Sequence, residues 1–476
     1  MLGKILPAVA LGGGVALLWP ELSWRVDTLK LVTADVATLQ SVTTFKEQQI
    51  KHQDILKNCE DVIVLEDQGV AILSCDPQRD AWNTVMGTFI DPSQPGAIFQ
   101  WFYSDPSAFP QPLALEGFGG RAGADFHPLG IEYHSDSSTL YIVNHASSGP
   151  TIEVFDYVPW GGFGRASAQH RATVAHPSAV WTPNSIHALN ATSFLLTNDH
   201  GFRARERFVL HKLETYAALP LGNVVQITLP AELPTAQEDD DGNRIPLALG
   251  PEDVSVKTVA SGIPFANGVA LLNSTTLAVA STNGHSLKLF DLSTNDTEDG
   301  SVSLTHKTDV PAPALLDNLS VDAQGRLLAG GHPRPGALTA TVAFRASCLQ
   351  LRAKAQAIAL AAEQAAEQEL EKKLGDDEQQ KPLMDDIADA TAKKTVEIVM
   401  AEEEKALLER CAVDYDKTPP SWVGELVFDE QTGVPGWKEV YVGSEFGAST
   451  TAARDTKEGV VLVVGLYEKG VLVGKE

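Results

Sequence analysis

Carboxylate and amide side chains recur in this sequence beside short apolar runs, where β-strands are expected to end. The members are Glu60, Asp61, Asn184 in TPNSIHAL, Asn267 in PFANGVAL, and Asp317 and Asn318 in LLDNLSVD. Each offers a hard oxygen ligand and none is a thiol or an imidazole, so the chemistry that they favour is binding of Ca²⁺. Each Asn or Asp is also explained by a turn, and composition alone does not decide between these interpretations.

The elements that must position these residues are predicted to be β-strands over residues 60–345 and 421–474. Several apolar runs follow one phrase of strand, turn and strand: TLYIVNH with TIEVFDY, then TLAVASTNGHSLKLFDL, then RLLAGGHP. Small antiparallel units repeated every 40 to 50 residues or so indicate a β-propeller, here with about six blades. A β-sandwich is the main rival, but it does not explain the repeated phrase. A propeller would bring its strand ends together around a central channel.

One segment, residues 346–418, departs from this pattern because it is rich in Ala, Glu, Lys and Leu. Its composition predicts two helices joined by a turn near Gly375. The hairpin would bring Cys348 and Cys411 together, so both a disulfide and two reduced cysteines stay open. Either a lid or partner-binding arm, or a solvated excursion from a loop, fits this insertion. The expected segments are 1–24 (leader), 25–345 (propeller), 346–418 (helical hairpin) and 419–476 (closing strands).

The N-terminus carries an apolar segment over residues 5–20, with no charged residue before Glu21. Its length fits a signal peptide or a retained signal anchor, and a buried N-terminal strand or helix is the alternative. Three glycosylation sequons, at Asn190, Asn273 and Asn295, agree with the secretory pathway. Four cysteines without metal-ligand spacing permit two disulfides whose pairing the sequence leaves open. We therefore expect an extracellular or membrane-anchored glycoprotein.

Composition and motifs exclude several classes of protein. The 476 residues include 36 Lys and Arg against 62 Asp and Glu, a formal net charge of −26. This charge argues against a general nucleic-acid binder, which needs a basic surface for phosphates. The sequence also lacks G-x-S-x-G, H-E-x-x-H and the glycine patterns of nucleotide-binding loops, so serine-hydrolase, zinc-protease and nucleotide-binding interpretations have no motif support.

Five dispersed blocks, in order, resemble the serum paraoxonase/arylesterase family of calcium-dependent six-bladed propeller hydrolases. They follow Glu60-Asp61 and are LGIEYH with LYIVNHASSGPTIEVFDY, NSIHALNATSFLLTNDHGF, GIPFANGVAL and LLDNLSVDAQGRLLAGGHP. The match runs from about residue 25 to residue 345, with a looser match towards the C-terminus. The resemblance implies an all-β fold, a six-bladed β-propeller. Together with the composition of residues 346–418 and 5–20, it leads us to expect such a propeller with an inserted helical hairpin and an apolar N-terminal helix.

The resemblance also implies which residues bind calcium. The family's catalytic calcium would be held by Glu60, Asn184, Asn267, Asp317 and Asn318. The Asn318-Leu319-Ser320 sequon would then be a buried ligand and not a glycosylation site. A second, structural calcium in the family uses positions matching Asp61, the backbone carbonyl of Ile131, and an Asp that is Ser185 here. That replacement puts the second site in doubt.

The family's catalytic histidines are matched less completely. His145 matches one member of the pair that acts on water, whereas the other falls on Leu129. His127 lies two residues away and is either a substitute or a turn residue. The further candidates that match family positions near the metal are His200, Asp199 and His332. A neutral imidazole or a carboxylate can orient an attacking water. We interpret His187 and His211 as ordinary surface or strand residues.

The resemblance leads to a functional expectation with two alternatives. The chain is expected to hydrolyse carboxylic esters and lactones with Ca²⁺, as an arylesterase or lactonase with phosphotriesterase activity as a side reaction. Its partner would be a small-molecule substrate and not nucleic acid. One alternative is a calcium-binding propeller without hydrolytic activity, which Leu129 and Ser185 favour. The other is a strictosidine-synthase-like enzyme, which the complete calcium set disfavours.

Overall fold

The structure is a computed structural model that describes residues 25–26, 28–118, 125–159, 166–233, 247–294, 300–374 and 381–476. The predicted leader, residues 1–24, and the sequon at Asn295 lie outside the described residues. The chain divides into two compact units, one formed by Met1–Leu338 with Thr418–Glu476 and the other by Thr339–Lys417. None of the described helices is both long enough and apolar enough to cross a membrane.

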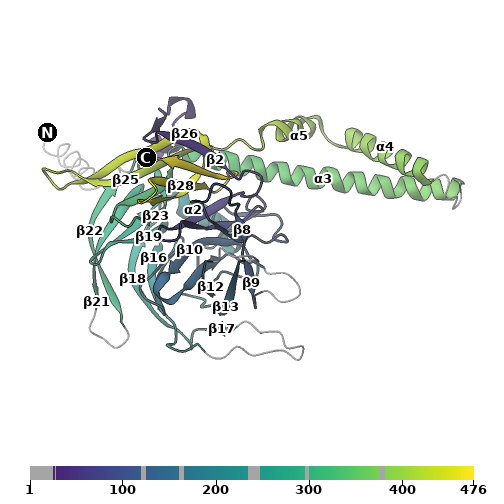
Figure 1. Ribbon diagram of the computed structural model, residues 1–476. Helices are drawn as coiled ribbons and strands as arrows, with labels where there is room; N and C mark the ends of the chain where they lie inside the picture. Colours follow the sequence, from purple (N-terminus) through teal and green to yellow (C-terminus); the bar gives the residue numbers. More distant parts are fainter. Residues whose placement is uncertain are drawn as a thin grey trace, which may run out of the picture. The chain divides into compact units, whose positions relative to one another are not determined.

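The first unit is mostly β, as predicted, and its described residues form six sheets of four or more strands (Figure 1). Three of these sheets come first in the sequence. The first holds β3 (Cys59–Leu65), β4 (Val70–Cys75), β7 (Ala97–Trp101) and β8 (Gln111–Pro112). The second holds β10 (Pro128–His134), β11 (Thr139–Asn144), β12 (Thr151–Tyr157), β13 (Ser167–Val174), β9 (Ala114–Glu116) and β17 (Ala248–Leu249). The third holds β14 (Pro183–Ala188), β15 (Ser193–Asn198), β16 (Gly222–Thr228) and β18 (Ser255–Ile263).

The other three sheets use the later strands together with two from the N-terminal part. The fourth holds β19 (Ala266–Asn273), β20 (Thr276–Ser281), β21 (Ser286–Thr294) and β22 (Val302–Pro311). The fifth holds β23 (Leu315–Val321), β24 (Leu327–His332), β25 (Pro420–Phe428), β26 (Pro435–Gly447) and β1 (Val42–Thr43). The sixth holds β27 (Ser449–Asp455), β28 (Val460–Gly465), β29 (Val471–Lys475) and β2 (Glu47–Lys51). The smaller elements are the hairpin β5 (Trp82–Asn83) with β6 (Thr88–Phe89), and the 3₁₀ turns η1 (Val36–Thr38) and η3 (Ser135–Ser137).

The first strands of the six sheets lie next to one another in sequence order. Strand β3 contacts β10, which contacts β14, followed by β19, β23 and β27, and β27 in turn contacts β3. The second strands are buried along most of their length, as the all-buried run of β11 illustrates. One core cluster joins Tyr141 and Val143 of β11 to Phe194 and Leu196 of β15, so adjacent sheets pack face to face. This packing positions the first strands side by side.

Two features of the first unit were not predicted. A disulfide joins Cys59 to Cys75 across the paired strands β3 and β4. Helix α2 (Ala204–Ala217) interrupts the third sheet between β15 and β16, in a region that the sequence pattern assigned to strands. The assignment of continuous β-structure is therefore wrong for this segment.

The second unit is helical, with α3 (Pro335–Leu374), α4 (Lys381–Val399) and α5 (Glu402–Asp414). The prediction of one continuous second helix is wrong, because a break at Met400–Ala401 separates α4 from α5. A disulfide joins Cys348 to Cys411, which settles the pairing that the sequence left open. Lys354 of α3 also pairs with Glu404 of α5 at 2.6 Å, so these two helices lie side by side.

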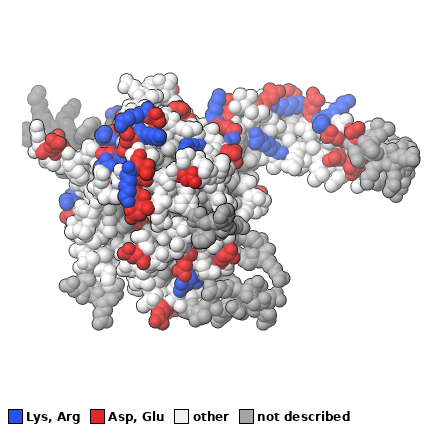
Figure 2. All heavy atoms as spheres, in the orientation of Figure 1, with Lys and Arg blue, Asp and Glu red and all other residues white. Residues whose placement is uncertain are grey.

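Charged side chains of both signs are mixed on the face of the molecule shown in Figure 2, where acidic and basic residues alternate. On this face, the described acidic residues are not gathered into one patch. Such a face lacks the clustered Lys and Arg with which proteins bind a phosphate backbone.

Candidate metal centre and active-site pocket

Five predicted calcium ligands come together on the first strands of four sheets. We call Glu60 of β3, Asn184 of β14, Asn267 of β19, and Asp317 and Asn318 of β23 the oxygen cluster. In each strand the pairing register shifts where a cluster member stands, between Cys59 and Asp61 for example. Such bulges leave a residue outside the ladder and redirect its side chain. The bulges explain how residues far apart in sequence direct polar groups to one place.

Glycines allow the first strands to approach each other closely at the cluster. A Cβ at Gly130 would lie 2.4 Å from the Asn184 carbonyl oxygen. A Cβ at Gly268 would lie 2.6 Å from the Leu319 nitrogen. Side chains do not tolerate such contacts, so both glycines are needed for the spacing of the strands that carry the ligands.

The side-chain nitrogens of the cluster point to acceptors inside the protein. Asn318 Nδ2 donates to Glu60 Oε1 at 2.8 Å, and Asn267 Nδ2 donates to Asp317 Oδ1 at 2.8 Å. Asn184 Nδ2 lies 3.4 Å from Asp199 Oδ2. These contacts fix the orientation of the three amides, so that each turns its oxygen away from the donated bond.

Four oxygens of the cluster are buried without a hydrogen-bond partner in the structure. They are Glu60 Oε2, Asn184 Oδ1, Asn267 Oδ1 and Asn318 Oδ1. Unsatisfied buried acceptors cost free energy, so a concentration of them points to a missing donor or cation. One is a carboxylate oxygen and three are side-chain amide oxygens, which are ligands that Ca²⁺ takes. Glu60 and the three asparagines therefore fit a calcium ion, whereas the two oxygens of Asp317 already contact Asn267 and His332.

The acid–base state of the cluster agrees with a cation site. Burial, followed by the charges of Asp61 and Asp317, raises the pKa of Glu60 well above its usual range. A bound divalent cation reverses such a shift, because it stabilises the carboxylate. Across the described residues, no group of three or more His, Cys, Asp or Glu is placed to hold a metal. Three of the five cluster members are amides, which is a composition suited to Ca²⁺ and not to zinc.

The residues of the predicted second calcium site do not fit an ion in the same way. Asp61 Oδ1 accepts from Val62 N at 2.8 Å and from Thr451 Oγ1 at 2.9 Å, while its Oδ2 accepts from Ile131 N at 2.9 Å. Burial raises the pKa of Asp61 to about 6. Neither Asp61 nor Ser185 has a buried side-chain oxygen without a partner. Asp61 thus contacts the N–H group of Ile131 and is already satisfied by protein donors.

A pocket of about 140 Å³ contains two of the predicted catalytic residues, His145 and Asp199. We call it the histidine pocket because His211 lines it as well. Its apolar wall is formed by aromatic residues, namely Trp82, Phe89, Trp181 and Phe202. The pocket borders the oxygen cluster, because Pro183 and Asp199 line it while Asn184 follows Pro183 and contacts Asp199. A concave pocket with an aromatic wall beside these oxygens is suited to a ligand with an apolar part.

His145 is held by hydrogen bonds at both ring nitrogens. Nε2 lies 2.7 Å from the Pro183 carbonyl oxygen, and Nδ1 lies 2.5 Å from Thr84 Oγ1. A carbonyl oxygen only accepts, so Nε2 carries the proton. Burial lowers the pKa of His145 to about 4, which keeps the ring neutral near pH 7. The Nδ1 lone pair therefore accepts from the Thr84 hydroxyl.

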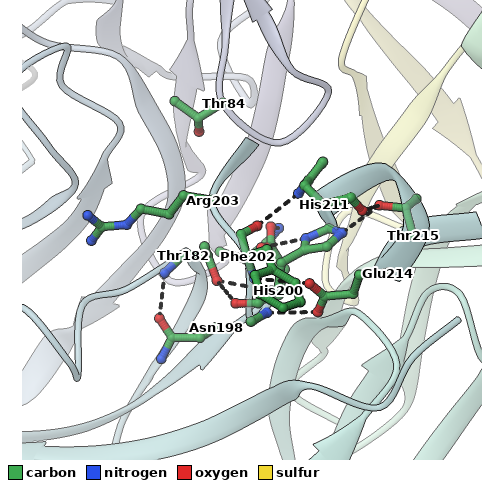
Figure 3. Close-up of polar contacts among 12 residues, drawn as sticks. Thr84, Thr182, Asn198, His200, Phe202, Arg203, His211, Glu214 and Thr215 are labelled. Carbon is green, nitrogen blue, oxygen red and sulfur yellow. Dashed lines mark hydrogen bonds and ion pairs between the residues drawn. The ribbon is translucent and has the colours of Figure 1, made fainter. Parts of the chain in front are cut away.

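His200 lies beside the pocket and contacts Asp199. Its Nδ1 lies 2.8 Å from Asp199 Oδ1, and its Nε2 lies 2.9 Å from Thr215 Oγ1 (Figure 3). The ring centroid of His211 lies 4.1 Å from that of His200. The imidazole of His200 lowers the pKa of Asp199 although burial opposes this, so the carboxylate stays ionised.

Helix α2 holds this group in place. Glu214 is buried and accepts backbone bonds from Gly201 N at 2.7 Å and from Phe202 N at 3.0 Å (Figure 3). His211 contacts the Phe202 carbonyl oxygen through Nδ1 at 3.0 Å. Burial lowers the pKa of His211 to about 4. The interpretation of His211 as an ordinary surface or strand residue is wrong, because it is buried in a helix that lines the pocket.

The two remaining predicted histidines lie elsewhere. His332 Nε2 lies 2.9 Å from Asp317 Oδ2, so His332 orients a cluster member. His127 Nδ1 lies 2.9 Å from Asp76 Oδ2, and its Nε2 lies 3.2 Å from the Pro92 carbonyl oxygen. Neither histidine lines the histidine pocket. Leu129, which stands where the family has a histidine, is 3% exposed and belongs to an apolar core cluster.

Three contributors to the site were missed by sequence reasoning, namely Thr84, His211 and Glu214. Glu214 and His211 lie three residues apart in RERFVLHKLETYA, whose helix-forming composition is the signal that could have identified α2. Thr84 carries no signal in the sequence, because its contact with His145 depends on the packing of the β5–β6 hairpin.

Comparison with known proteins gives one match to a family model, described as Arylesterase, over residues 38–236. No curated protein matches the chain. Among solved structures, a gluconolactonase of Xanthomonas campestris is similar, with a TM-score of 0.39 and 10% identity over 91% of this chain and 96% of that one. Regucalcin, a calcium-binding protein of Agrobacterium tumefaciens, has a TM-score of 0.35 and 10% identity over 62% of this chain and 74% of that one.

The matched range includes Glu60, Asn184, His145 and Asp199, whereas Asn267 and the pair on β23 lie beyond it. The part of the chain that supplies the histidine pocket is thus the part that the family model covers. Over residues 38–236, the resemblance of this chain to the serum paraoxonase/arylesterase family is therefore confirmed.

Proposed function

We propose that this chain is a calcium-dependent hydrolase of carboxylic esters and lactones. The observation that carries the proposal is the set of four unpartnered buried oxygens contributed by Glu60, Asn184, Asn267 and Asn318. The histidine pocket beside this set provides a neutral imidazole and an ionised carboxylate next to aromatic walls. The match of residues 38–236 to the arylesterase family model supports the same chemistry.

The proposed architecture is a six-bladed β-propeller whose central channel holds the oxygen cluster. The six sheets and the contact of each first strand with the next, from β3 around to β27 and back, support this assignment. The strands from β1 to β24 and from β25 to β29 would form the blades, with helices α3 to α5 inserted in the sequence between them; the predicted hairpin start at residue 346 is too late, because α3 begins at Pro335. This geometry accounts for the convergence of polar residues that are more than 250 positions apart, as the contact between Asn318 and Glu60 illustrates.

In the proposed reaction the chain's own residues bind and orient the substrate and the attacking water. The aromatic wall would hold the apolar part of an ester or lactone and exclude bulk water. Asp199, kept ionised beside His200, would orient the water, and His145 would accept its proton. Bound Ca²⁺ would supply polarisation of the carbonyl oxygen and stabilisation of negative charge. The same polarisation would apply to a phosphoryl oxygen, so we include phosphotriesters as secondary substrates.

We further propose that the protein passes through the secretory pathway. Two disulfides, Cys59–Cys75 and Cys348–Cys411, suit an oxidising compartment. The sequon residues Asn190 and Asn273 lie at exposed turns, where glycosylation is sterically allowed. Asn318 is 2% exposed, which agrees with a role as ligand and not as glycosylation acceptor.

One observation favours a second candidate, a calcium-binding protein without hydrolytic activity. Both ring nitrogens of His145 are engaged, and Leu129 replaces the second histidine of the family pair. A protein of this kind would bind Ca²⁺ with the same ligands but would not turn over esters.

An assay of the purified chain separates the two candidates. Phenyl acetate and a panel of lactones are hydrolysed with Ca²⁺ and not after EDTA treatment if the leading proposal holds. Asp317→Ala should abolish this activity, whereas the matched control Asp309→Ala, an exposed residue paired with Lys288, should not. Calcium binding without turnover would support the second candidate. Hydrolysis that survives metal removal would contradict the leading one.

A further inference from the structure

The environment of His145 raises a question about how this residue can act as a base. Its Nε2–H is held by the Pro183 carbonyl at 2.7 Å, and its Nδ1 lone pair is occupied by the Thr84 hydroxyl at 2.5 Å. His145 is 6% exposed. Its imidazole has only these two nitrogens, so no third nitrogen is free to receive a proton. A water molecule thus cannot approach the basic nitrogen while Thr84 stays in place.

The arrangement of His145 and Thr84 is held by several independent contacts. Trp82 Nε1 donates to the His145 carbonyl oxygen at 2.8 Å, which ties the β5–β6 hairpin to the histidine. Asn83, between Trp82 and Thr84, donates from Nδ2 to the Tyr467 hydroxyl at 3.0 Å and accepts the Met86 N–H at 2.9 Å. After Thr84, Lys212 Nζ donates to the Met86 carbonyl oxygen at 3.0 Å, so the hairpin is anchored on both sides of the threonine.

Thr84 is the more exposed member of the pair at the pocket. It lines the histidine pocket together with His145 and Asp199, and it is only partly buried. A hydroxyl can accept one hydrogen bond while it donates another, so it can connect a water in the pocket to the buried lone pair. In many enzymes a hydroxyl contacts a base, and a third group orients that base. Here the hydroxyl is that of Thr84, the base is His145, and the Pro183 carbonyl orients the histidine.

We propose that the Thr84 hydroxyl is a catalytic proton relay between the attacking water and His145, an inference that rests on the proposed hydrolase function. As the water oxygen attacks the carbonyl carbon, the water gives a proton to Thr84 Oγ1 while Thr84 gives its own proton to His145 Nδ1. The bond from the carbonyl carbon to the leaving oxygen then breaks. The leaving oxygen receives the proton from His145 through the same hydroxyl, which restores the neutral imidazole and the threonine.

The test compares Thr84→Val, which removes the hydroxyl at nearly constant shape, with Thr84→Ser, which keeps it. Thr88→Val is the matched control, because Thr88 lies on β6 of the same hairpin and does not line the pocket. We expect kcat for ester hydrolysis to fall about 100-fold in Thr84→Val, within the usual range for loss of a proton-transfer group. Thr84→Ser and Thr88→Val should retain most of the wild-type rate. Thermal unfolding of each variant checks that the fold is kept.

A second measurement does not depend on activity. In the metal-free chain labelled with ¹⁵N-histidine, the Nδ1 signal of His145, assigned by its loss in His145→Gln, should show a hydrogen-bonded unprotonated nitrogen. Thr84→Val should move it to the position of a free one, and Thr84→Ser should not. An unchanged Nδ1 signal in Thr84→Val would overturn the proposal.

Three activity results would also overturn the relay. They are a Thr84→Val enzyme as active as Thr88→Val, a Thr84→Ser enzyme as slow as Thr84→Val, and an acyl group found on Thr84 by mass spectrometry after acid quench. The last would make the threonine a nucleophile. A wild-type chain that hydrolyses none of the substrates with Ca²⁺ would overturn the proposed function as well, whereas the three results above leave it standing.

Discussion

The oxygen cluster and the histidine pocket are neighbours with opposite hydrogen-bonding states. In the cluster, Glu60 and the three asparagines each keep a buried oxygen without a partner. In the pocket, His145 has partners at both ring nitrogens, and beside the pocket Glu214 of helix α2 accepts with both carboxylate oxygens. The histidine is satisfied by the protein itself, whereas four oxygens of the cluster have no partner within the protein. Burial of polar residues alone is thus a weaker sign of a metal site than burial without partners.

The largest expected effect is the loss of Ca²⁺ affinity in Glu60→Gln, which changes the oxygen cluster and not the histidine pocket. This variant removes a charge from the cluster while keeping its shape, so Ca²⁺ affinity should fall at least about 100-fold, because ligand charge helps to set that affinity. Hydrolysis at limiting Ca²⁺ should fall with it. Isothermal titration with CaCl₂ and an ester assay measure the two effects. An unchanged Ca²⁺ affinity would contradict the distinction between the two regions, because the cluster would then not be the calcium site.

The next effect is a loss of folding stability in acid, caused by the histidines of the pocket. Burial lowers the pKa of His145 to about 4, so the folded chain binds this proton more weakly than the unfolded chain, whose histidine has a pKa near 6.5. The stabilisation is complete above about pH 6.5 and is lost as the pH falls towards 4, by about 3 kcal/mol for His145. His211, whose pKa is also lowered to about 4, acts in the same direction.

Urea unfolding of the wild type at pH 7 and at pH 4.5 measures this acid effect. The loss should be smaller in His145→Gln, which has no imidazole to protonate. A free energy of unfolding that stays level over this range would show that the pocket histidines are not held neutral.

A smaller effect is expected for Glu214→Gln, the matched control for Glu60→Gln. One amide oxygen can replace a carboxylate oxygen, but the new NH₂ group faces a backbone N–H of Gly201 or Phe202. The free energy of unfolding should fall by about 2 kcal/mol, since hydrogen bonds to charged groups are worth about that much. Ca²⁺ affinity should stay at the wild-type value. A loss of affinity equal to that of Glu60→Gln would erase the distinction between the regions.

The smallest effect is expected for the helical unit. Replacing residues 349–410 by a short Gly-Ser linker, with Cys348 and Cys411 changed to Ser, should leave Ca²⁺ affinity and hydrolysis of phenyl acetate unchanged. The reason is that none of the described residues of this range, 349–374 and 381–410, belongs to the cluster or lines the pocket. Assays over the lactone panel test this expectation. A changed substrate range would instead assign the unit to a lid.

Repetition in the sequence predicted many of the strands, although β1 and β2 lie before the predicted range. The phrases TLYIVNH with TIEVFDY fall on β11 and β12, because alternating apolar residues bounded by turns have no other way to bury one face. The five cluster residues were also found from sequence, through hard-oxygen chemistry and the family resemblance. Helix α2 was missed, because a single helix inside a long β-rich stretch gives little periodic signal beside the surrounding strands.

The pocket could be predicted only in part. His145 and Asp199, expected as catalytic candidates, both line the pocket, but the position of His127 depends on a buried contact with Asp76, which lies 51 residues earlier. Thr84 reaches His145 only because Trp82 and Asn83 anchor the hairpin. Such contacts between side chains distant in sequence arise from tertiary packing, which local patterns do not encode.

Calcium titration of the metal-free chain tests the central claim most directly. Isothermal titration calorimetry on wild type, Glu60→Gln and Glu214→Gln should show one ion bound per chain in the wild type and in Glu214→Gln, with strongly weakened binding in Glu60→Gln. Binding should also raise the thermal midpoint of the wild type, as a ligand of the folded state does. The account would be contradicted if the wild type bound no Ca²⁺ at millimolar concentration, or if all three proteins bound it equally.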